Sequence, residues 1–383
     1  MIKNRNLFRL SRFVIFNFPK LLRILSKFCT PKKRVLLIKT DAIGDYILFR
    51  NFIEVVKKSD QFKDYEIDLL GNELWKDVAL EYDTASISEF IFVRPNALLE
   101  APLQIFKLGW GLFRKNYHTV LQPTYSRTLI ADGLAAFTAA KEIIGFESDY
   151  EGILKKYKKR TDKFYTAKLM LPPDVYFEFD RTKYFFENIL NQNIDLKGPK
   201  LDIAESERSG IMIFPGAGSI KRSWSVQNFM ALTRLIMDDT SHQIYAAGGP
   251  SEQAAGDYLT ENLPPERFTN LIGKTSLPEL IRHIASSALI ISNDSSAIHI
   301  AAATGTPSVC ILGGGHYERF APYPSHIENG PVCVYYKMPC YYCNWICKFE
   351  TLGDEPFPCI ANVELAEVWR ATKGLLTHIN NDQ

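Results

Sequence analysis

The chain alternates between short apolar runs and longer segments in which apolar residues recur once per helical turn. A short apolar run is typical of a buried strand, and the recurring spacing is typical of an amphipathic helix. In the first half, strand-type runs cover residues 34–39, 65–70, 89–93 and 118–122, and helical spacing covers 46–58 and 126–140. This alternation favours a parallel sheet flanked by helices.

A second alternating series follows a polar stretch, residues 196–209, that contains Gly and Pro and is typical of a linker. Its strand-type and helix-type segments cover 210–218, 225–239, 242–249, 266–273, 277–287, 288–294, 297–305 and 307–314. A chain of 383 residues is long enough for two domains. We therefore predict an α/β fold with two Rossmann-like doubly wound domains, at 34–200 and 201–365, and a closing helix at 366–383.

Residues 1–33 form a basic amphipathic segment before the first domain. Residues 1–40 carry eleven Lys and Arg and no Asp or Glu, so the rest of the chain has a net charge of −9 within the overall +2. Apolar residues recur at helical spacing from Leu7 to Phe28, and the longest apolar run, Phe13–Phe16, is too short to cross a bilayer. We predict that this segment lies on an anionic membrane surface. A helix that is solvated or packed on the first domain is the alternative. A basic arm on an acidic body is a poor nucleic-acid footprint, so no nucleic-acid partner is expected.

Four late cysteines are closely spaced: Cys340, Cys343, Cys347 and Cys359. Four thiols at such spacing are able to hold zinc, although the paired C-x-x-C motifs of a zinc ribbon are absent. The sequence shows no export signal, so we expect a reducing compartment and no disulfides. Reduced thiols that pack within the fold are the expectation, and a metal site is the alternative.

The first segment with candidate chemistry is "FPGAGSIKRSW", residues 214–224. A strand ends in a glycine-containing turn, two cationic side chains follow, and a helix begins near Ser225. Glycines let a ligand approach the backbone, and free N–H groups and a cation suit phosphate oxygens. The predicted phosphate ligands are Gly216, Gly218, Ser219, Lys221 and Arg222. The G-x-x-x-x-G-K-[ST] pattern of a Walker loop is absent. A plain strand–helix turn is the alternative.

The second segment is "IISNDSSAIHIAAATGTP", residues 290–307. A buried strand delivers polar residues to its carboxyl end, where a helix begins. Asp294 or Ser295 could cap that helix, or the free N–H groups could face a phosphate. His299 lies one turn into the helix, on the same side as Ser295 and Ser296. We predict that these four residues contact a ligand, and the alternative is a helix cap with a structural histidine.

Two further loops also follow strands. In "AAGGPSEQ", residues 246–253, Glu252 stands where it could meet a ribose hydroxyl, or it could simply favour a helix N-terminus. In "LIGKTSLPEL", residues 271–280, the loop could line a nucleotide base. The candidate base and ribose contacts in that loop are Lys274, Thr275 and Leu277.

The turn after the first strand, "KTDAIGD" at residues 39–45, carries two carboxylates. A dinucleotide loop needs three glycines and this turn has only Gly44, which disfavours a dehydrogenase. Asp45 starts the following helix, and Asp41 lies earlier in the turn. Either residue could be an N-cap. A carboxylate that faces a cleft opposite a diphosphate site would instead suit a general base for a hydroxyl nucleophile.

Taken together and in this order, these motifs resemble glycosyltransferase family 9, the bacterial lipopolysaccharide heptosyltransferases. The resemblance covers most of residues 34–365 and includes the opening turn, the stretch 125–146, the glycine loops, the "NDSSAIH" segment and the late cysteines. It implies the GT-B fold, in which two Rossmann-like domains face a central cleft. The C-terminal domain would hold the nucleotide sugar and the N-terminal domain the acceptor.

The resemblance also implies an activity, namely inverting, metal-independent transfer of a sugar, with ADP-heptose as the usual donor. The acceptor would be a lipopolysaccharide core or a related lipid-linked glycan, and no cofactor besides the donor is expected. Such an enzyme would be cytoplasmic and peripheral to the inner membrane, to which the basic N-terminal segment would bind.

The resemblance assigns the catalytic base to Asp45, the Asp directly after the glycine, and leaves Asp41 as a turn-former. The family's diphosphate-binding Lys precedes a Trp in a K-x-W element. Arg222 holds that position here and Lys221 lies one residue earlier, so both stay candidates.

The family's D-[ST]-G-x-x-H motif falls on Asp294, Ser295 and His299, with Ser296 in place of the glycine. The ribose-contacting Glu falls on Glu252, and a basic acceptor contact falls on Arg127.

Two rival functions use the same sequence features. A nucleotide-sugar epimerase on this fold would convert the donor alone, without an acceptor. A carbohydrate-binding protein with an inactive site would keep its function when Asp45 is replaced.

Overall fold

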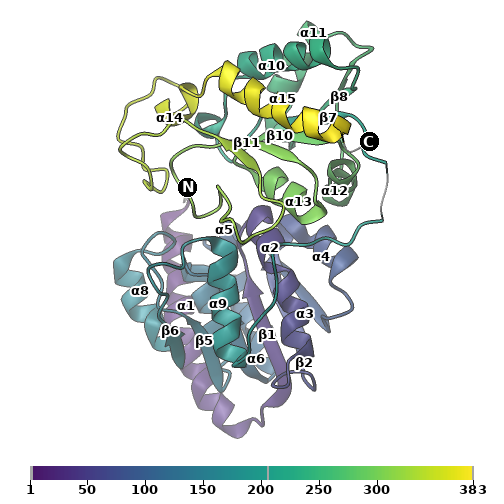
Figure 1. Ribbon diagram of the computed structural model, residues 1–383. Coiled ribbons are helices and arrows are strands. Elements are labelled where there is room, and N and C mark those ends of the chain that lie inside the picture. Colours follow the sequence, from purple (N-terminus) through teal and green to yellow (C-terminus); the bar gives the residue numbers. More distant parts are fainter. Residues whose placement is uncertain (1–2, 205–206, 382–383) are drawn as a thin grey trace. The chain divides into compact units, whose positions relative to one another are not determined.

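The computed structural model describes residues 3–204 and 207–381 and divides the chain into two compact units, Met1–Asp195 and Leu196–Gln383 (Figure 1). Each unit contains one six-stranded sheet, and every strand pair within the sheets is parallel. Parallel pairing with helical crossovers is what alternating strand and helix patterns predict. The predicted α/β fold of two doubly wound units is therefore confirmed.

The first unit is built on a sheet with the strand order β3-β2-β1-β4-β5-β6. The strands are β1 (Lys32–Lys39), β2 (Glu66–Asn72), β3 (Glu89–Val93), β4 (Tyr117–Gln122), β5 (Glu142–Phe146) and β6 (Ala167–Leu169). The helices are α1 (Arg5–Leu25), α2 (Ile43–Phe49), α3 (Asn51–Lys58), α4 (Lys76–Tyr82), α5 (Pro95–Leu98), α6 (Pro102–Arg114), α7 (Leu129–Phe137), α8 (Lys155–Thr161) and α9 (Glu178–Leu190). The apolar pattern marked β1 to β4 and α7, whereas the shorter β5 and β6 were not predicted.

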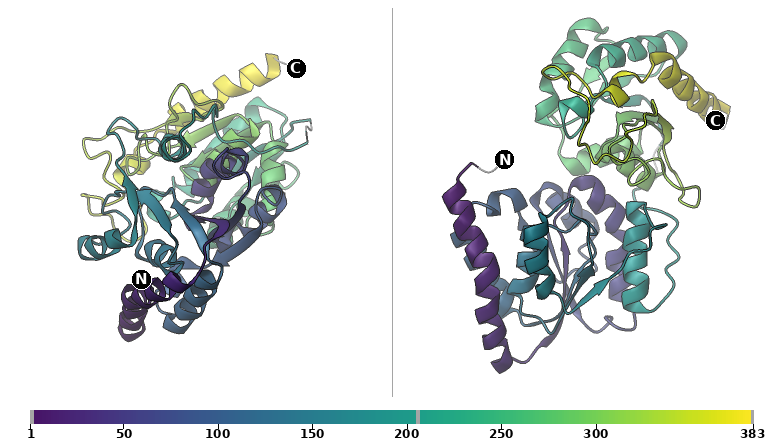
Figure 2. Two further views of the ribbon diagram at one scale, coloured as in Figure 1. Left: turned by 90° about the horizontal axis from the view of Figure 1, so that it is seen from below. Right: turned by 90° about the vertical axis from the view of Figure 1, so that its left-hand side faces the viewer.

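Helix α1, the N-terminal segment, is part of the packing of the first unit. Its residues Ile15, Phe18 and Leu22 are buried in one core cluster with residues of α6 and α7. The rings of Phe18 and Phe106 have centroids 4.4 Å apart. Figure 2 shows α1 in purple along one side of this unit. The structure therefore shows a helix packed on the domain through one face, with its outer face exposed to solvent, and the predicted membrane binding stays a prediction. In the described part of the chain, no helix is both long and apolar enough to cross a membrane.

The second unit repeats the architecture with the strand order β12-β11-β10-β7-β8-β9. The strands are β7 (Ile211–Phe214), β8 (Ile244–Ala246), β9 (Phe268–Asn270), β10 (Leu289–Asn293), β11 (Ser308–Ile311) and β12 (Val332–Val334). The helices are α10 (Val226–Asp239), α11 (Gln253–Asn262), α12 (Leu277–Ala285), α13 (Ser296–Thr304), α14 (Pro358–Ala361) and α15 (Leu365–Asn381). Helix α15, the predicted closing helix, packs in the core of this unit through Val368 and Leu376.

In both units the chain reverses its direction of progress across the sheet at one point. That point lies between β1 and β4 in the first unit and between β7 and β10 in the second. At such a switch point, the loops after the two neighbouring strands run in opposite directions, and a crevice forms between them. Ligands of doubly wound folds bind in this crevice. The turns at 40–45, 215–224 and 294–296 follow the central strands β1, β7 and β10, so the fold brings the predicted motifs to the expected positions within each unit.

Candidate functional site

Asn293 joins the two central loops of the second unit at the end of β10. Its Nδ2 donates hydrogen bonds to the carbonyl oxygens of Pro215 and Gly216 at 2.9 Å and 3.1 Å. Its Oδ1 accepts from the backbone N–H of Trp224 at 2.8 Å. Because the side chain is fully buried, these bonds hold the 215–224 turn against the start of α13. Sequence reasoning did not select Asn293, although an Asn that ends a buried apolar strand was a visible signal.

The glycine turn itself is open to solvent. Gly216 is partly buried, whereas Gly218 and Ser219 are exposed. A short 3-10 helix, Ile220–Arg222, follows, and the side chain of Ser225 then caps α10 by accepting from the N–H of Asn228 at 3.1 Å. The turn therefore presents accessible backbone beside two cationic side chains, which is the arrangement predicted for a phosphate loop.

The two cationic side chains have different partners. The guanidinium of Arg222 lies 3.9 Å from Asp294, at the start of α13, and 4.0 Å above the ring of Trp345. Its Nε is buried and has no hydrogen-bond partner among the described residues. Burial lowers the pKa of Arg222 although Asp294 opposes the shift. The ammonium of Lys221 instead donates to the hydroxyl of Thr351 at 2.7 Å. Arg222 is thus the cation that lies between the two central loops.

The N-terminus of α13 lies beside Arg222, and the first N–H groups of a helix have no partner within the helix. Ser295 is the N-cap and its hydroxyl accepts from the N–H of Ala297 at 3.3 Å. Ser296 is the first residue of the helix, and Asp294, Ser295 and Ser296 are all partly exposed. A helix N-terminus favours negative charge, so an anion beside Arg222 would be stabilised by both groups.

His299 is the fourth residue of α13 and is almost fully buried, with 4% of its surface exposed. Its Nδ1 shares a hydrogen bond of 2.8 Å with the hydroxyl of Tyr323. Burial lowers the pKa of His299 to about 4, so the imidazole is neutral near pH 7. The structure shows a buried, hydrogen-bonded histidine, and the ligand contact predicted for it stays a prediction.

Glu252 lies against two glycine loops at once. A Cβ added to Gly216 would lie 2.1 Å from the Cγ of Glu252, and one added to Gly248 would lie 3.0 Å from its Oε2. Larger residues at these positions would displace the carboxylate, so the absence of a side chain lets the loops close around it. Ser251 donates a hydrogen bond of 2.6 Å to its Oε1. Glu252 is therefore next to the 214–222 turn, and its predicted ribose contact stays a prediction.

The fourth loop is paired with the third. The N–H of Gly273 donates to the carbonyl of Gly248 at 3.0 Å. Lys274 is exposed and its ammonium donates to the carbonyl of Asn270 at 2.8 Å. Thr275 is partly exposed, and Leu277 is the first residue of α12. The four loops of the second unit thus form one connected group at the carboxyl ends of β7, β8, β9 and β10.

A cysteine-bearing loop, residues 336–357, packs beside the same turn. Trp345 lies against Gly315, where an added Cβ would come within 2.2 Å of the indole, and its Nε1 donates to Nδ1 of His316 at 3.3 Å. The N–H of Phe357 donates to the carbonyl of Lys221 at 2.8 Å. These contacts place the ring of Trp345 under Arg222, and sequence reasoning did not identify Trp345.

The four late cysteines lie around one cavity of about 10 Å³ in this loop region. It is lined by Cys340, Cys343, Cys347 and Cys359 together with apolar side chains. All seven cysteines are free thiols, and burial raises the pKa of Cys343 and Cys359. Among the described residues, no group of His, Cys, Asp and Glu side chains has the arrangement of a metal site. The four thiols thus pack around one small cavity, and both their predicted structural role and the alternative metal site stay predictions.

In the first unit, the turn after β1 places Asp41 and Asp45 differently. Asp41 forms an ion pair of 3.0 Å with the buried Lys39 and accepts a hydrogen bond of 2.6 Å from Thr124, which follows β4. Asp45 is in the first turn of α2 and is partly exposed. Burial opposes the charge of Lys39, but Asp41, Asp45 and Glu178 outweigh it and raise its pKa. Asp41 thus fastens the turn to β4, and Asp45 lies near a buried cation.

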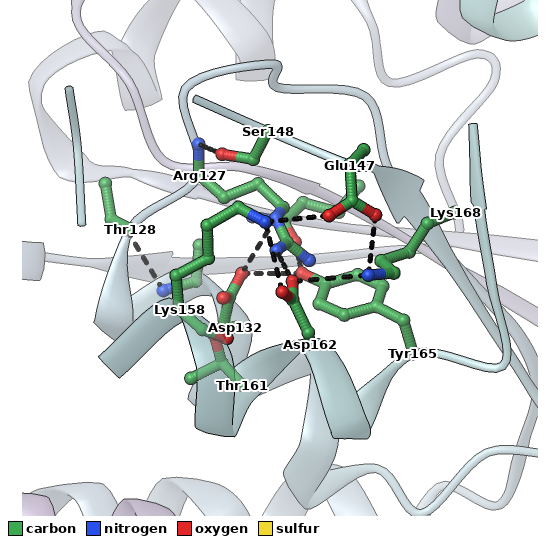
Figure 3. Close-up of polar contacts among 12 residues, drawn as sticks. Arg127, Thr128, Asp132, Glu147, Ser148, Lys158, Thr161, Asp162, Tyr165 and Lys168 are labelled. Atoms are coloured by element: carbon green, nitrogen blue, oxygen red, sulfur yellow. Dashed lines mark hydrogen bonds and ion pairs between the residues drawn. The ribbon is translucent and has the colours of Figure 1, made fainter. Parts of the chain in front are cut away.

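Arg127 is fully buried within the first unit. Figure 3 shows its polar contacts. Its guanidinium pairs with Asp162, lies 3.9 Å from Asp132 and stacks 4.3 Å above the ring of Tyr165. Lys158 joins the network through a hydrogen bond of 3.0 Å to Asp162. Burial opposes the charge of Arg127, but Tyr165, Asp132 and Asp162 raise its pKa overall. These contacts give Arg127 a structural role, and its predicted acceptor contact stays a prediction.

Comparison with known proteins bears on this arrangement. The family model of glycosyltransferase family 9 (heptosyltransferase) matches residues 105–344, which is more than half of the chain. The chain belongs to glycosyltransferase family 9. The resemblance seen in the motifs is therefore confirmed.

Individual relatives of family 9 agree with this assignment. Lipopolysaccharide heptosyltransferase 3 of Escherichia coli is 30% identical over 131 residues, 34% of this chain and 38% of that protein. The first three curated relatives are matched over only 32% to 38% of their own length. Two solved structures, each 17% identical in sequence, match nearly the whole chain. E. coli ADP-heptose lps heptosyltransferase II covers 90% of this chain and is matched over 99% of its own length, with a TM-score of 0.67. A family 9 glycosyl transferase from Veillonella parvula covers 91% of this chain and is matched over 98% of its own length, with a TM-score of 0.69. They show that the fold is that of the heptosyltransferases, which confirms the predicted GT-B class.

Proposed function

We propose that this family 9 protein is an inverting glycosyltransferase that moves heptose from ADP-heptose onto a lipopolysaccharide core or a related lipid-linked glycan. The observation that carries the proposal is the position of Arg222, between an accessible glycine turn and the N-terminus of α13, with a buried Nε that has no partner among the described residues. A diphosphate would supply hydrogen-bond acceptors for this guanidinium and negative charge in addition to that of Asp294.

The donor would bind to the second unit. Its diphosphate would contact Arg222 and the N–H groups at the start of α13, and its ribose would meet Glu252. As the bond to the anomeric carbon breaks, negative charge develops on the leaving diphosphate. Arg222 and the helix N-terminus would stabilise that charge more strongly than the charge of the ground state, which accelerates the transfer.

The acceptor would be activated by Asp45 of the first unit. Its carboxylate would take the proton from an acceptor hydroxyl while the oxygen attacks the anomeric carbon from the face opposite the leaving group. The buried ammonium of Lys39 and the carboxylate of Asp45 attract one another, which contributes to the raised pKa of Lys39. In this mechanism no metal ion and no further cofactor takes part. A lipid-linked acceptor would place the reaction at the cytoplasmic face of the inner membrane.

The test is the transfer rate of an Asp45→Asn variant, with Asp60→Asn as the matched control on an exposed carboxylate of the same unit. Loss of a general base lowers kcat by about 10²- to 10⁴-fold. We expect that loss for Asp45→Asn, together with unchanged affinity for ADP-heptose in calorimetry, and a normal rate for Asp60→Asn.

Two results would contradict the proposal. Transfer at the normal rate by Asp45→Asn would exclude Asp45 as the base. Turnover of the nucleotide sugar at full rate without an acceptor, measured by mass spectrometry of the products, would indicate an epimerase instead.

A further inference from the structure

We propose that the first unit docks on an anionic lipid bilayer through one surface to which α1, α6 and α8 each contribute. We call it the three-helix surface. It combines an exposed apolar band on α1 and α6 with a basic border on α1 and α8. The inference rests on the geometry of the first unit alone and does not depend on the sugar-transfer proposal.

Helix α1 has two apolar faces, and only one of them is buried. Ile15 and Leu22 have at most 1% of their surface exposed because they pack on the unit. The outward face carries an apolar row with about half or more of each side chain exposed: Leu10 (54%), Phe13 (66%), Leu21 (51%) and Ile24 (57%). The row continues past the end of the helix at Phe28, which is 86% exposed. Packing in the domain therefore uses one face of α1 and leaves the other without a partner in the described structure.

Helix α6 widens this apolar band. Phe106 packs on Phe18 of α1, yet 43% of its surface is exposed. Leu103 and Trp110 lie on the same face of α6, at helical spacing from Phe106, and are 64% and 41% exposed. Large apolar side chains exposed on two helices that pack together are typical of a surface that meets a partner. A Trp at its edge is typical of a surface at the membrane–water interface.

Helix α8 supplies positive charge on the other side of α1. The guanidinium of Arg160 lies 3.5 Å above the ring of Phe16, and Arg12 of α1 contacts Tyr157. Lys155, Lys156, Lys159 and Arg160 are all exposed. Together the three helices contain twelve Lys and Arg and no Asp or Glu. Residues 41–383 together carry a net charge of −9, so the three-helix surface concentrates positive charge on an otherwise acidic chain.

The combination of features selects a bilayer as the partner. An amphipathic surface with Phe and Leu on one face and Lys and Arg beside it binds at the headgroup boundary of anionic membranes. A nucleic acid would bind the positively charged side chains but would leave the exposed apolar band uncovered. A second copy of the same surface would bring two basic borders together, and like charges across an interface oppose association.

The experiment is co-sedimentation of the full-length protein with vesicles that contain no donor and no acceptor. We expect binding to vesicles of phosphatidylethanolamine and phosphatidylglycerol, weaker binding at high salt, and no binding to vesicles of phosphatidylcholine alone. The double variant Phe13→Ser, Trp110→Ser should weaken binding by about tenfold or more. The double variant Lys156→Gln, Lys159→Gln should weaken it by a similar factor.

Matched controls come from the same unit. Leu74 and Leu80 are 64% and 41% exposed, close to the values of Phe13 and Trp110, and Lys58 and Lys76 are exposed lysines. Serine at both leucines, or glutamine at both lysines, should leave vesicle binding unchanged. Circular dichroism should show intact folding for all four double variants, because every substituted side chain is at the surface.

Three results would overturn the inference. The first is a wild-type protein that stays in the supernatant with phosphatidylglycerol vesicles. The second is loss of binding in the control variants as large as in the variants of the three-helix surface. The third is a solution dimer, found by analytical ultracentrifugation, that Phe13→Ser, Trp110→Ser dissociates, since the surface would then join two copies of the chain.

Discussion

His299 is a buried side chain of the second unit whose pKa differs between the folded and the unfolded chain. It is held neutral by burial, with a pKa of about 4, and bonded to Tyr323. In the unfolded chain a histidine takes up a proton near pH ~6.5. Between these two values the unfolded state binds more protons, so the free energy of unfolding falls as the pH falls.

This difference predicts a pH-dependent stability. Between about pH 7 and about pH 5 the His299 contribution to the free energy of unfolding should fall by about 2 kcal/mol. Urea titration at both pH values measures the change, and His299→Gln should remove that part of it while the other titrating groups remain. If the variant keeps the whole pH dependence of the wild type, His299 is not its source.

Arg222 and Lys221 are neighbours in sequence but not in their interactions. Arg222 lies by Asp294, whereas Lys221 is hydrogen-bonded to Thr351. Since a charge-assisted hydrogen bond is worth ~1.5–3 kcal/mol, Arg222→Gln should weaken ADP binding by about tenfold to a hundredfold. Lys221→Gln is the matched control and should have a smaller effect. Calorimetry with ADP measures both, and a larger loss for Lys221→Gln would reverse the assignment.

At the scale of elements, the loop of residues 336–357 acts as a support for the glycine turn. It contacts the turn through Trp345 beneath Arg222 and through the bond from Phe357 to the carbonyl of Lys221. Gly313 and Gly315 have no side chains, and an added Cβ at either would come within 2.7 Å of the indole. The two glycines therefore leave room for the indole ring of Trp345 to pack against the backbone. The four packed thiols lie in the same loop region.

This arrangement predicts that Trp345 positions Arg222 without contacting the substrate. A cation over an aromatic ring is stabilised by about 0.5–2 kcal/mol, so Trp345→Leu should raise the KM for the donor by roughly threefold to thirtyfold. Trp345→Phe should restore part of the loss, and kcat should change less than KM. Phe349→Leu, which replaces an exposed ring in the same loop, serves as the control. An unchanged KM for Trp345→Leu would show that Arg222 is held without the ring.

At the scale of the whole molecule, the chain uses one topology twice for two kinds of chemistry. In each unit the central strands deliver their loops to a switch point, but the residues there differ. The first unit has the carboxylates Asp41 and Asp45 beside the buried Lys39. The second has a glycine turn, Arg222 and a helix N-terminus. Under the proposed function, the first unit would supply the general base and the second unit the anion site for the donor.

Much of this organisation was predictable from the sequence, because it depends on local patterns. The apolar runs of β1, β2, β7 and β10 and the turn residues after them are adjacent in the chain. In a parallel sheet all such turns emerge at the same edge, so the motifs had to gather there once the fold class was known. The family followed from the same motifs. Strands β5 and β6 were not predicted: Gly145 interrupts the apolar run of β5, and no residue of β6 is buried.

The tertiary structure alone decided what depends on residues distant in sequence. Arg222 differs from Lys221 because Trp345 and Thr351, more than a hundred positions later, fold back onto the turn. Arg127 is buried because Asp162 and Tyr165 close over it. The sequence by itself determined that the N-terminal segment is a basic amphipathic helix. Only packing against α6, α7 and α8 decided which of its apolar residues enter the core and which stay exposed, since burial depends on the neighbours that a helix meets.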